Sequence, residues 1–487
     1  MRVVFQVPVK AVLAAFFEED SIMKHRLSTV LTLALALPLL TLERSAFADE
    51  VTKPSDKPVA PAPDAKAKRS AQEDYELYQI FVDTLDQVER NYVKDVSRRE
   101  LMEAAIEGVL TKLDPYSSYI NREDLGRFKT TVESQFGGIG IQVGMERDQL
   151  KVISPLVGTP AYRAGIMSGD SIVEIEGKPT AGLSLEEAVR KLKGEAGTSV
   201  TMTVVHSGSA DRKTISVTRE VIHVETVLGD RRRADDSWDF MLDHDKHIGY
   251  IRVTAFSRDT TEDLKKALVE LQKEQLKGLI LDLRFNPGGL LTSAIEVSDL
   301  FVEEGRIVST QGRNASERTW EAVKDGTVEN FPMVVLVNKY SASASEIVSA
   351  CLQDHKRAVI VGERTWGKGS VQNVIELEGG KSALKLTTAG YRRPNGHNIH
   401  RFPDSKDTDE WGVMPNDGML VKLSDAEMAD LLRERRERDI LSAKSDKPAA
   451  EAKPEAEKTV PAKPSAFVDR QLQKAIDYLS QEVVKAP

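Results

Sequence analysis

The sequence lacks the features that would tie the chain to a disulfide, a cysteine-based metal site or a nucleic acid. It holds one cysteine, Cys351, so an intramolecular disulfide and a zinc site of several cysteines are both excluded. The eight histidines are scattered, and no His-Glu-x-x-His pattern occurs. A basic excess is also missing, because the net charge is −9, which argues against a nucleic-acid partner.

What the sequence does contain is typical of a soluble globular protein. Apolar residues make up 40% and charged residues 29% of the chain. These values exclude a wholly disordered or collagen-like chain. At about 100–200 residues per domain, the 487 residues predict two to four domains.

The N-terminal segment has the layout of a secretory signal peptide. Met23–Arg26 is basic, residues 27–42 are mainly apolar, and Ser45–Ala48 ends in Ala-x-Ala. This order predicts a signal peptide over residues 23–48, with cleavage after Ala48 and with Met23 as an alternative start to Met1. A membrane anchor is the other interpretation, but the apolar stretch is short for a span of about 20 residues. We therefore expect the mature chain in the periplasm.

Two segments are predicted to be linkers, and two others are predicted to be helical. Residues 49–71 and 446–464 are rich in Pro, Ala and Lys and show no apolar period, so disorder is expected there. Helical apolar spacing marks residues 72–122, where Ser97 and Glu100 suggest a capping box, and a C-terminal helix over residues 465–485. Both apolar stripes need a partner, either each other or a second subunit. The second option would make the chain a homo-oligomer through the terminal helices.

Residues 130–221 combine short strands with glycine-bearing turns. The run from Phe136 to Val143 places Gly138, Ile139 and Gly140 in a turn before a strand. Consecutive backbone N–H groups in such a turn can bind an anion, and a free strand edge beside it can pair with an extended peptide. A hairpin bulge is the plain alternative. A dinucleotide loop is disfavoured because its third glycine is misplaced and a strand follows where a helix is needed.

A second run in the same region carries a family resemblance. The pattern Ala164-Gly165, Gly169-Asp170 and Ile175-Glu176-Gly177 resembles PDZ domains of the kind that accompany bacterial proteases. The resemblance implies that Gly138, Ile139 and Gly140 supply the N–H groups that bind a peptide's terminal carboxylate. It also implies that the helix near residues 184–192 forms the other wall of the groove.

Residues 222–425 predict an α/β core. The apolar runs Ile248–Val253, Gly278–Leu283 and Met333–Val337 alternate with helical stretches. Such an alternation is typical of buried strands in a sheet covered by helices.

Within this core, a serine and a lysine could act together. Ser343 follows a buried strand and opens a helix, and its plain interpretation is a capping box with Glu346. Lys368 lies among glycines and apolar residues, where lysine is seldom found, and burial would lower its pKa so that it can accept a proton. Lys368 and Gln372 are four residues apart, so on a strand they would face the same side. The N–H of Ala344 and the turn at Gly288-Gly289 could stabilise an oxyanion, although that turn could also be an ordinary connection.

These segments resemble the carboxy-terminal processing, or tail-specific, serine proteases. The matching runs are Asp282–Gly289, Ser341–Glu346, Gln353-Asp354, Val361–Glu363 and Gly367–Gln372, in the family order. The resemblance implies that Ser343 is the nucleophile, Lys368 the general base and Gln372 the residue that orients the lysine. Oxyanion N–H groups would come from Ala344 and Gly289, with Gly288 as the neighbouring candidate, and Asp354 would be structural. Trp366 replaces the family's usual phenylalanine.

Together, the motifs predict a multidomain α/β protein with a crotonase-like protease core, an inserted PDZ domain and flanking helices. We expect a serine endopeptidase that reads substrate C-termini and needs no cofactor or metal. The alternatives are a non-catalytic PDZ scaffold and a latent protease that needs a partner, such as an adaptor protein. A trypsin-type enzyme is excluded because its nucleophile motif is absent. The acidic and histidine-rich run at 243–247 is hydrophilic and reads as a solvated loop.

Overall fold

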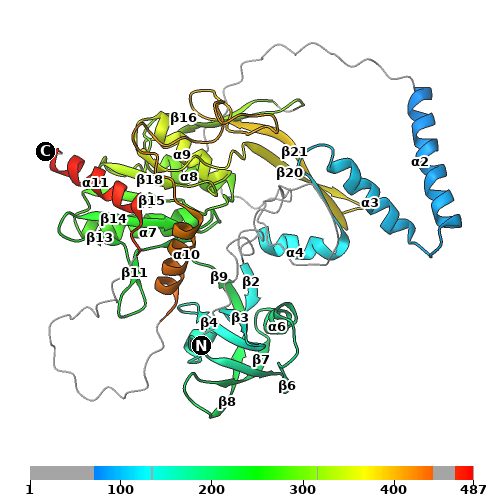
Figure 1. Cartoon of the computed structure of the whole chain (residues 1–487), viewed down its shortest axis with the longest axis horizontal. Coiled ribbons are helices and arrows are strands. Elements are labelled where there is room, and N and C mark those ends of the chain that lie inside the picture. The colour runs from blue at the N-terminus through cyan, green and yellow to red at the C-terminus, as the bar shows by residue number, and fades with distance from the viewer. Residues whose placement is uncertain (1–70, 133–134, 315, 442–466, 486–487) are drawn as a thin grey trace.

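The computed structural model describes residues 71–132, 135–314, 316–441 and 467–485 (Figure 1). The predicted signal peptide over residues 23–48 lies outside the described residues. So do the predicted linkers at 49–71 and 446–464, apart from residue 71. Among the described helices, none has the length and apolar character needed to cross a bilayer.

The core is built on a mostly parallel sheet with the strand order β10-β14-β15-β18-β19, and β13 pairs with β14. The four parallel strands are fully or almost fully buried, as expected when helices cover both faces. The strands span Val227–Leu228 (β10), Met241–Asp243 (β13), Ile248–Val253 (β14), Gly278–Asp282 (β15), Met333–Val337 (β18) and Val359–Gly362 (β19).

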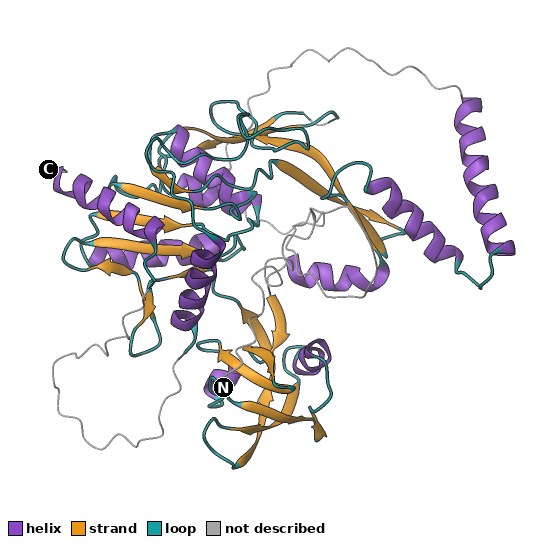
Figure 2. Cartoon of the chain, in the orientation of Figure 1, coloured by secondary structure: helices purple, strands orange, loops and turns teal. Residues whose placement is uncertain are grey.

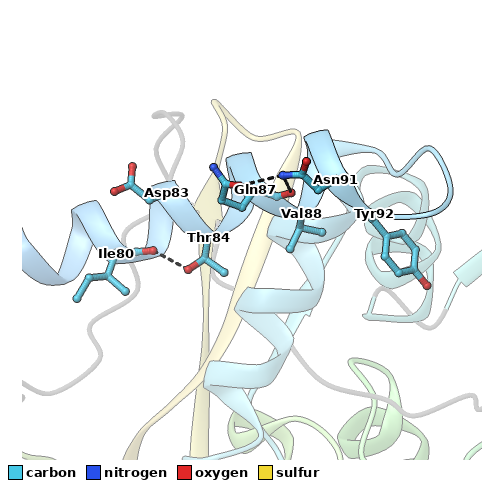
Figure 3. Close-up of a pocket in the computed structure, with 7 residues that line it drawn as sticks. All are labelled: Ile80, Asp83, Thr84, Gln87, Val88, Asn91 and Tyr92. Carbon is cyan, nitrogen blue, oxygen red and sulfur yellow. Dashed lines mark hydrogen bonds between the residues drawn. The ribbon is translucent and has the colours of Figure 1, made fainter.

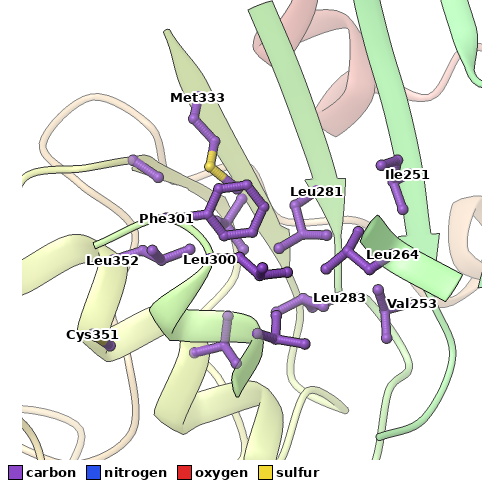
Figure 4. Packing of buried hydrophobic residues seen from close by; sticks show 14 of the residues in the cluster. Ile251, Val253, Leu264, Leu281, Leu283, Leu300, Phe301, Met333, Cys351 and Leu352 are labelled. Atoms are coloured by element: carbon purple, nitrogen blue, oxygen red, sulfur yellow. The ribbon is translucent and has the colours of Figure 1, made fainter. Parts of the chain in front are cut away.

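Alternate side chains of these strands enter two separate apolar clusters. Ile251, Leu281 and Val335 face α7 (Thr260–Lys273), α8 (Leu291–Asp299) and α9 (Ala344–Asp354) in the larger cluster, part of which Figure 4 shows. Tyr250, Ile280 and Val334 face the opposite side, where Ala475 and Leu479 of α11 (Arg470–Lys485) cover them. The period of two in each strand thus sets the two helical layers.

A second sheet ties the N-terminal region to the core. Its order is β1-β21-β16-β17, with β20 paired to β21. The strand β1 (Ser118–Ile120) follows the N-terminal helices and pairs antiparallel with β21 (Ser382–Arg392). The other members are β16 (Gly305–Gln311), β17 (Arg318–Ala322) and β20 (Ser370–Leu377). The helix α4 (Arg122–Val132) leads from β1 toward the next unit.

Residues from about 135 to 223 form a separate small unit, visible at the bottom of Figure 2. Its sheet order is β3-β4-β5-β7-β8, so β3 is an edge strand that pairs only with β4. Its elements are β2 (Gln135–Gly138), β3 (Ile141–Glu146), β4 (Gln149–Pro155), α5 (Pro160–Arg163), β5 (Ser171–Ile175), β6 (Lys178–Pro179), α6 (Leu185–Leu192), β7 (Ser199–Val205), β8 (Arg212–Thr218) and β9 (Glu220–His223).

Three hydrogen bonds fasten this unit to the core, one of them between His223 Nδ1 and Asp259 Oδ2 at 3.2 Å. Tyr162 Oη donates to Asp236 Oδ2 at 2.6 Å, close to the short pair β11 (Arg231–Arg232) and β12 (Trp238–Asp239). Leu441 N, just after α10 (Asp425–Asp439), donates to Ser154 Oγ at 3.3 Å. The orientation of the small unit is therefore set partly by the end of α10.

One of the two terminal apolar stripes is buried within the chain and the other is exposed. This corrects the prediction that both stripes pack against each other or against a second subunit. The C-terminal stripe on α11 is buried against the chain's own sheet. The N-terminal stripe on α2 (Ala71–Asn91) stays exposed, for example Ile80 at 65%, and Figure 1 shows α2 and α3 (Arg98–Leu110) projecting from the core. Ser97 makes no side-chain capping bond to α3, so that predicted capping box is absent.

Candidate active site

Ser343 occupies a strained turn between β18 and α9. Its φ is +57°, in the left-handed region that non-glycine residues rarely adopt. Gly288 lies directly against it, since a Cβ on Gly288 would be 2.8 Å from the Ser343 Cβ. Only glycine fits there, so the Gly288 loop and the serine turn are held in contact.

Glu346 connects this turn to the lysine loop. Its carboxylate accepts the N–H of Ser343 at 2.8 Å and the N–H of Lys368 at 2.8 Å. It also accepts the N–H of Gly367 and the hydroxyl of Thr365, both at 2.6 Å. Burial raises the pKa of Glu346 to about 7, although these four donors act in the opposite direction. One carboxylate therefore fixes the backbone of both the candidate nucleophile and the candidate base.

Lys368 is a buried amine whose pKa is lowered to about 8. Burial is the main cause, and the positive charge of Lys385 on β21 adds to it, while Glu346 opposes it. The Nζ atom lies 5.0 Å from the ring centroid of Tyr116, which the N-terminal region contributes from the segment before β1. Lys368 has no ion pair among the described residues, so an appreciable fraction is neutral near pH 8.

The predicted strand geometry of Lys368 and Gln372 is wrong. Lys368 precedes β20, so the alternation of faces along that strand does not extend to it. Gln372 Nε2 donates to Ser370 Oγ at 2.8 Å and to Thr387 Oγ1 at 3.3 Å. In the described structure it makes no hydrogen bond to Lys368, and none joins Ser343 Oγ to Lys368 Nζ. Such bonds are often long without a bound substrate.

Two backbone N–H groups next to Ser343 have no acceptor within the described chain, those of Ala344 and Gly289. The N–H of Gly288 instead donates to Asn286 Oδ1 at 2.8 Å. Gly289 has φ +148°, and a Cβ there would be 2.1 Å from the Phe256 carbonyl oxygen. Of the two glycines, Gly289 is thus the one whose donor is available to an oxyanion.

A buried ionic cluster supports the loop that carries these glycines. Asp282 at the end of β15 accepts from Arg284, from Tyr250 Oη at 2.8 Å and from Arg435 of α10. Arg284 also pairs with Asp469, just before α11. Burial would raise the pKa of Asp282, but the Arg284 and Arg435 guanidinium groups outweigh it and lower that pKa. Both C-terminal helices thereby hold the start of the loop.

The small unit presents a second pair of open donors. In the described residues, the N–H groups of Ile139 and Gly140 have no acceptor, and Gly138 is the last residue of β2. Gly140 has φ +76°, and a Cβ there would be 2.3 Å from Thr159 Cβ. The free edge of β3 begins at the next residue, and α6 packs beside it. This arrangement fits a groove for an extended chain with a terminal carboxylate.

Comparisons with known proteins agree with this geometry. Residues 247–408 match Peptidase family S41, residues 152–205 match a PDZ domain, and residues 45–124 match the N-terminal domain of the activating protease CtpB. A carboxy-terminal-processing protease of Bartonella bacilliformis is 38% identical over 375 residues, which cover 76% of this chain and 83% of that protein. The chain belongs to the S41 family of carboxy-terminal processing serine proteases.

Further relatives of this S41 protease are of the same kind. The carboxy-terminal processing protease CtpA of Bacillus subtilis is 36% identical over 318 residues, 65% of each chain. A solved structure of a photosystem II D1 C-terminal processing protease shares 27% identity, covering 75% of this chain and 97% of that one, with a TM-score of 0.39. The molecule is thus a multidomain α/β protein with a PDZ domain and an S41 peptidase core.

Several residues of the site were not singled out from the sequence. Glu346 was considered only as a helix cap, although a buried glutamate three residues after the serine is the feature that joins both loops. Lys385 and Tyr116 reach Lys368 through the pairing of β21 with β20 and β1, which no local motif reveals. Asp354, considered structural, accepts from Arg393 Nη2 at 2.6 Å.

Proposed function

We propose that the chain is a periplasmic serine endopeptidase in which Ser343 is the nucleophile and Lys368 the general base. The observation that carries this proposal is the buried Lys368, which has no ion pair in the part of the chain that the structure describes and whose pKa of about 8 leaves neutral amine available. A buried lysine without a carboxylate partner costs stability, so its presence points to a functional role. The core that carries it is proposed to be of the crotonase type.

The steps follow from the groups on each loop. Neutral Lys368 Nζ takes the proton of Ser343 Oγ as that oxygen bonds to the scissile carbonyl carbon. The carbonyl oxygen gains negative charge and accepts the N–H groups of Ala344 and Gly289. The C–N bond then breaks, and Lys368 returns the proton to the leaving amine. Water, deprotonated by Lys368, cleaves the acyl-enzyme and restores the hydroxyl. Gln372 would orient Lys368 by accepting an N–H of its amine at Oε1, while Nε2 donates to Ser370 and Thr387.

Substrate selection is proposed to occur in the PDZ unit. A substrate tail would pair with the free edge of β3, and its terminal carboxylate would accept the N–H groups of Gly138, Ile139 and Gly140. The side chains of α6 would then contribute to tail preference. The partners proposed for the chain are therefore proteins or peptides with accessible C-termini.

The test of the dyad uses the chain from Asp49 with an unfolded protein that ends in an apolar tail. Cleavage by the parent chain, but not by Ser343→Ala or Lys368→Ala, would support the dyad. Equal cleavage by all three chains would overturn it. If none cleaves and tail peptides still bind, the chain is a tail-binding scaffold or a latent protease that needs a partner such as an adaptor.

The periplasmic location is proposed from the signal-like residues 23–48 alone. A reporter enzyme active only after export, fused behind residue 48, should become active in a Gram-negative host. Removal of residues 27–42 should abolish its activity. Equal reporter activity with and without these residues would contradict export.

Self-association is proposed through α2 only, because α11 is covered by the core. The exposed apolar side chains of α2 include Tyr78 at 71%, Ile80 at 65% and Val82 at 60%, which is unusual for a helix in water. Figure 3 shows Ile80 among the residues that line a pocket along α2. Sedimentation of a chain lacking residues 71–95 should show a smaller species than the parent. A chain with Ile80→Gln and Val82→Gln should match it, and parent-like sedimentation of both variants would contradict this role.

A further inference from the structure

A cavity of about 340 Å³ lies where the PDZ unit, the core sheet and α10 meet. Ser154 and Pro155 line it from β4, Arg252 and Arg284 from the core, and Arg435 and Arg436 from α10. The cavity lies apart from the Ser343 and Lys368 side chains, neither of which lines it. None of the proposed steps of proteolysis uses it.

Two arginines that line this cavity each have a buried Nε without an acceptor among the described residues. The Arg435 side chain is 6% exposed; its Nη2 donates to Asp282, but its Nε has no partner. Arg232 donates from Nη1 to the Asp236 carbonyl oxygen and from Nη2 to Glu225, yet its buried Nε also lacks an acceptor. Both Nε atoms are closed off from solvent, so the groups that can reach an anion in the cavity are the terminal N–H groups of the arginines.

The arginines that line the cavity outnumber the carboxylates that pair with them. The arginines that line it are Arg232, Arg252, Arg284, Arg435 and Arg436. The carboxylates paired with them are those of Glu225, Asp439, Asp282 and Asp469. Five cations thus face four anions, and Arg436 is the one without an ion pair among the described residues. The excess is one positive charge.

We propose that this cavity binds a small oxyanion, a phosphate or a carboxylate, through the guanidinium groups of Arg232, Arg435 and Arg436. Guanidinium groups present planar pairs of N–H donors that match the oxygens of both anions, and such charged hydrogen bonds are the strong ones. The bound anion would accept from the terminal N–H groups of these arginines and neutralise the unpaired charge of Arg436.

The location gives such a ligand a route to the protease site. Arg284 and Phe285 line the cavity and belong to the loop that continues to Gly288 and Gly289. Ser154 and Leu156 of the PDZ unit line the same cavity. An oxyanion bound here would therefore contact both the PDZ unit and the loop that bears the Gly289 donor.

The test measures binding on the full chain and does not depend on its protease activity. Sodium phosphate and sodium succinate are titrated separately at constant ionic strength, with sodium chloride making up the difference. Unfolding temperature and tryptophan fluorescence are followed, because Trp238 lines the cavity and its ring lies 3.7 Å from the Arg232 Cζ. We expect a saturable rise in unfolding temperature with at least one anion and a fluorescence change at the same concentrations.

Two matched variants decide the outcome. Arg436→Gln removes the unpaired cation from an exposed position, so it should fold normally and weaken anion binding at least about tenfold. Arg433→Gln removes the same charge from the same helix, where its side chain is 60% exposed and pairs with Asp430 instead of lining the cavity. It should bind like the parent.

The anion that binds more tightly, phosphate or succinate, identifies the ligand as phosphate-bearing or carboxylate-bearing. No saturable response to either anion would overturn the proposal. An identical response of the parent, Arg436→Gln and Arg433→Gln would also overturn it, since it would mark a general salt effect.

Discussion

The PDZ unit and the protease core both present backbone N–H donors to a negatively charged oxygen, but they differ in the other groups that they carry. Within the described residues, the N–H groups of Ile139 and Gly140 in the PDZ loop have no acceptor, and neither do those of Gly289 and Ala344 in the core loops. In each place a glycine with positive φ is packed so closely that a Cβ would collide. Only the core site adds a hydroxyl on Ser343 and a buried amine on Lys368.

The comparison separates binding from cleavage. Open N–H donors suffice to hold a carboxylate that already carries its charge. Creating negative charge on a carbonyl oxygen also requires a nucleophile and a base that is neutral at working pH. In the core, Glu346 positions both groups and burial sets the pKa of the base. The predictions below change one side of this comparison at a time.

Removal of the Lys368 amine should give the largest effect. Lys368→Met should lower kcat/KM on a tailed substrate by about 10⁴-fold, because Ser343 then lacks its base. Tail-peptide affinity should stay unchanged. The variant should also be more stable at pH 7 by about 1–3 kcal/mol, since it removes a buried charge. Urea unfolding measures this gain, and Lys381→Met at an exposed position is the control. A less stable Lys368→Met chain would refute the argument from burial.

Loss of the Glu346 acceptor should have the next largest effect. Glu346→Gln replaces one acceptor oxygen with an amide donor that faces N–H groups, so the serine turn and lysine loop should move apart. We expect a drop in kcat/KM of about 10²-fold. Glu363→Gln is the matched control, because Glu363 is also buried but accepts from Leu423 N, away from Ser343. Similar losses for both variants would mean that Glu346 contributes stability alone.

The converse change should act on the PDZ unit. Gly140→Ala puts a Cβ against Thr159 and disfavours the φ of +76°, so the carboxylate loop should distort. Tail-peptide binding, measured by calorimetry, should weaken about tenfold or more. Cleavage of a short unfolded peptide without a tail should be unaffected. Gly144→Ala on β3, which meets only the Ile153 side chain, serves as the control. Unaltered tail affinity in Gly140→Ala would argue against this loop as the carboxylate site.

The smallest effect is expected from a change at Lys385, which acts only on the pKa of Lys368, the proposed general base. The positive charge of Lys385 helps to lower the pKa of Lys368. Because the neutral amine is the active form, kcat/KM should rise with pH through about 8 in the parent. In Lys385→Met the repulsion is gone, the pKa of Lys368 rises, and the midpoint should move to higher pH. Each unit of that move lowers the neutral fraction at pH 7 about tenfold. An unchanged midpoint would contradict the claim that Lys385 lowers the pKa of Lys368.

The parts of this arrangement that depend on residues close together in the sequence could be predicted. The apolar runs of β14, β15 and β18 and the turn before α9 follow from short patterns, and Ser343 and Lys368 stand out by their neighbours. The glycine pair at 288–289 could be found, but which N–H is open depends on the Asn286 side chain.

The rest depends on contacts between distant segments. Tyr116 and Lys385 reach Lys368 only because β1 and β20 both pair with β21. The start of β20 at Ser370, which leaves Lys368 outside the strand that carries Gln372, is not marked by the residue types. The stripes of α2 and α11 look alike in sequence, yet only α11 has a sheet face to cover. Periodicity predicts that a face is apolar but not what covers it.

The most direct test of the central claim is covalent labelling of the serine as a function of pH. The chain is incubated with a serine-reactive fluorophosphonate, and the labelled peptide is identified by mass spectrometry. We predict a single label on Ser343, a labelling rate that rises through a pH of about 8, and labelling at least about 100-fold slower in Lys368→Met. Labelling at another residue, or an equal rate in Lys368→Met, would contradict the serine–lysine account.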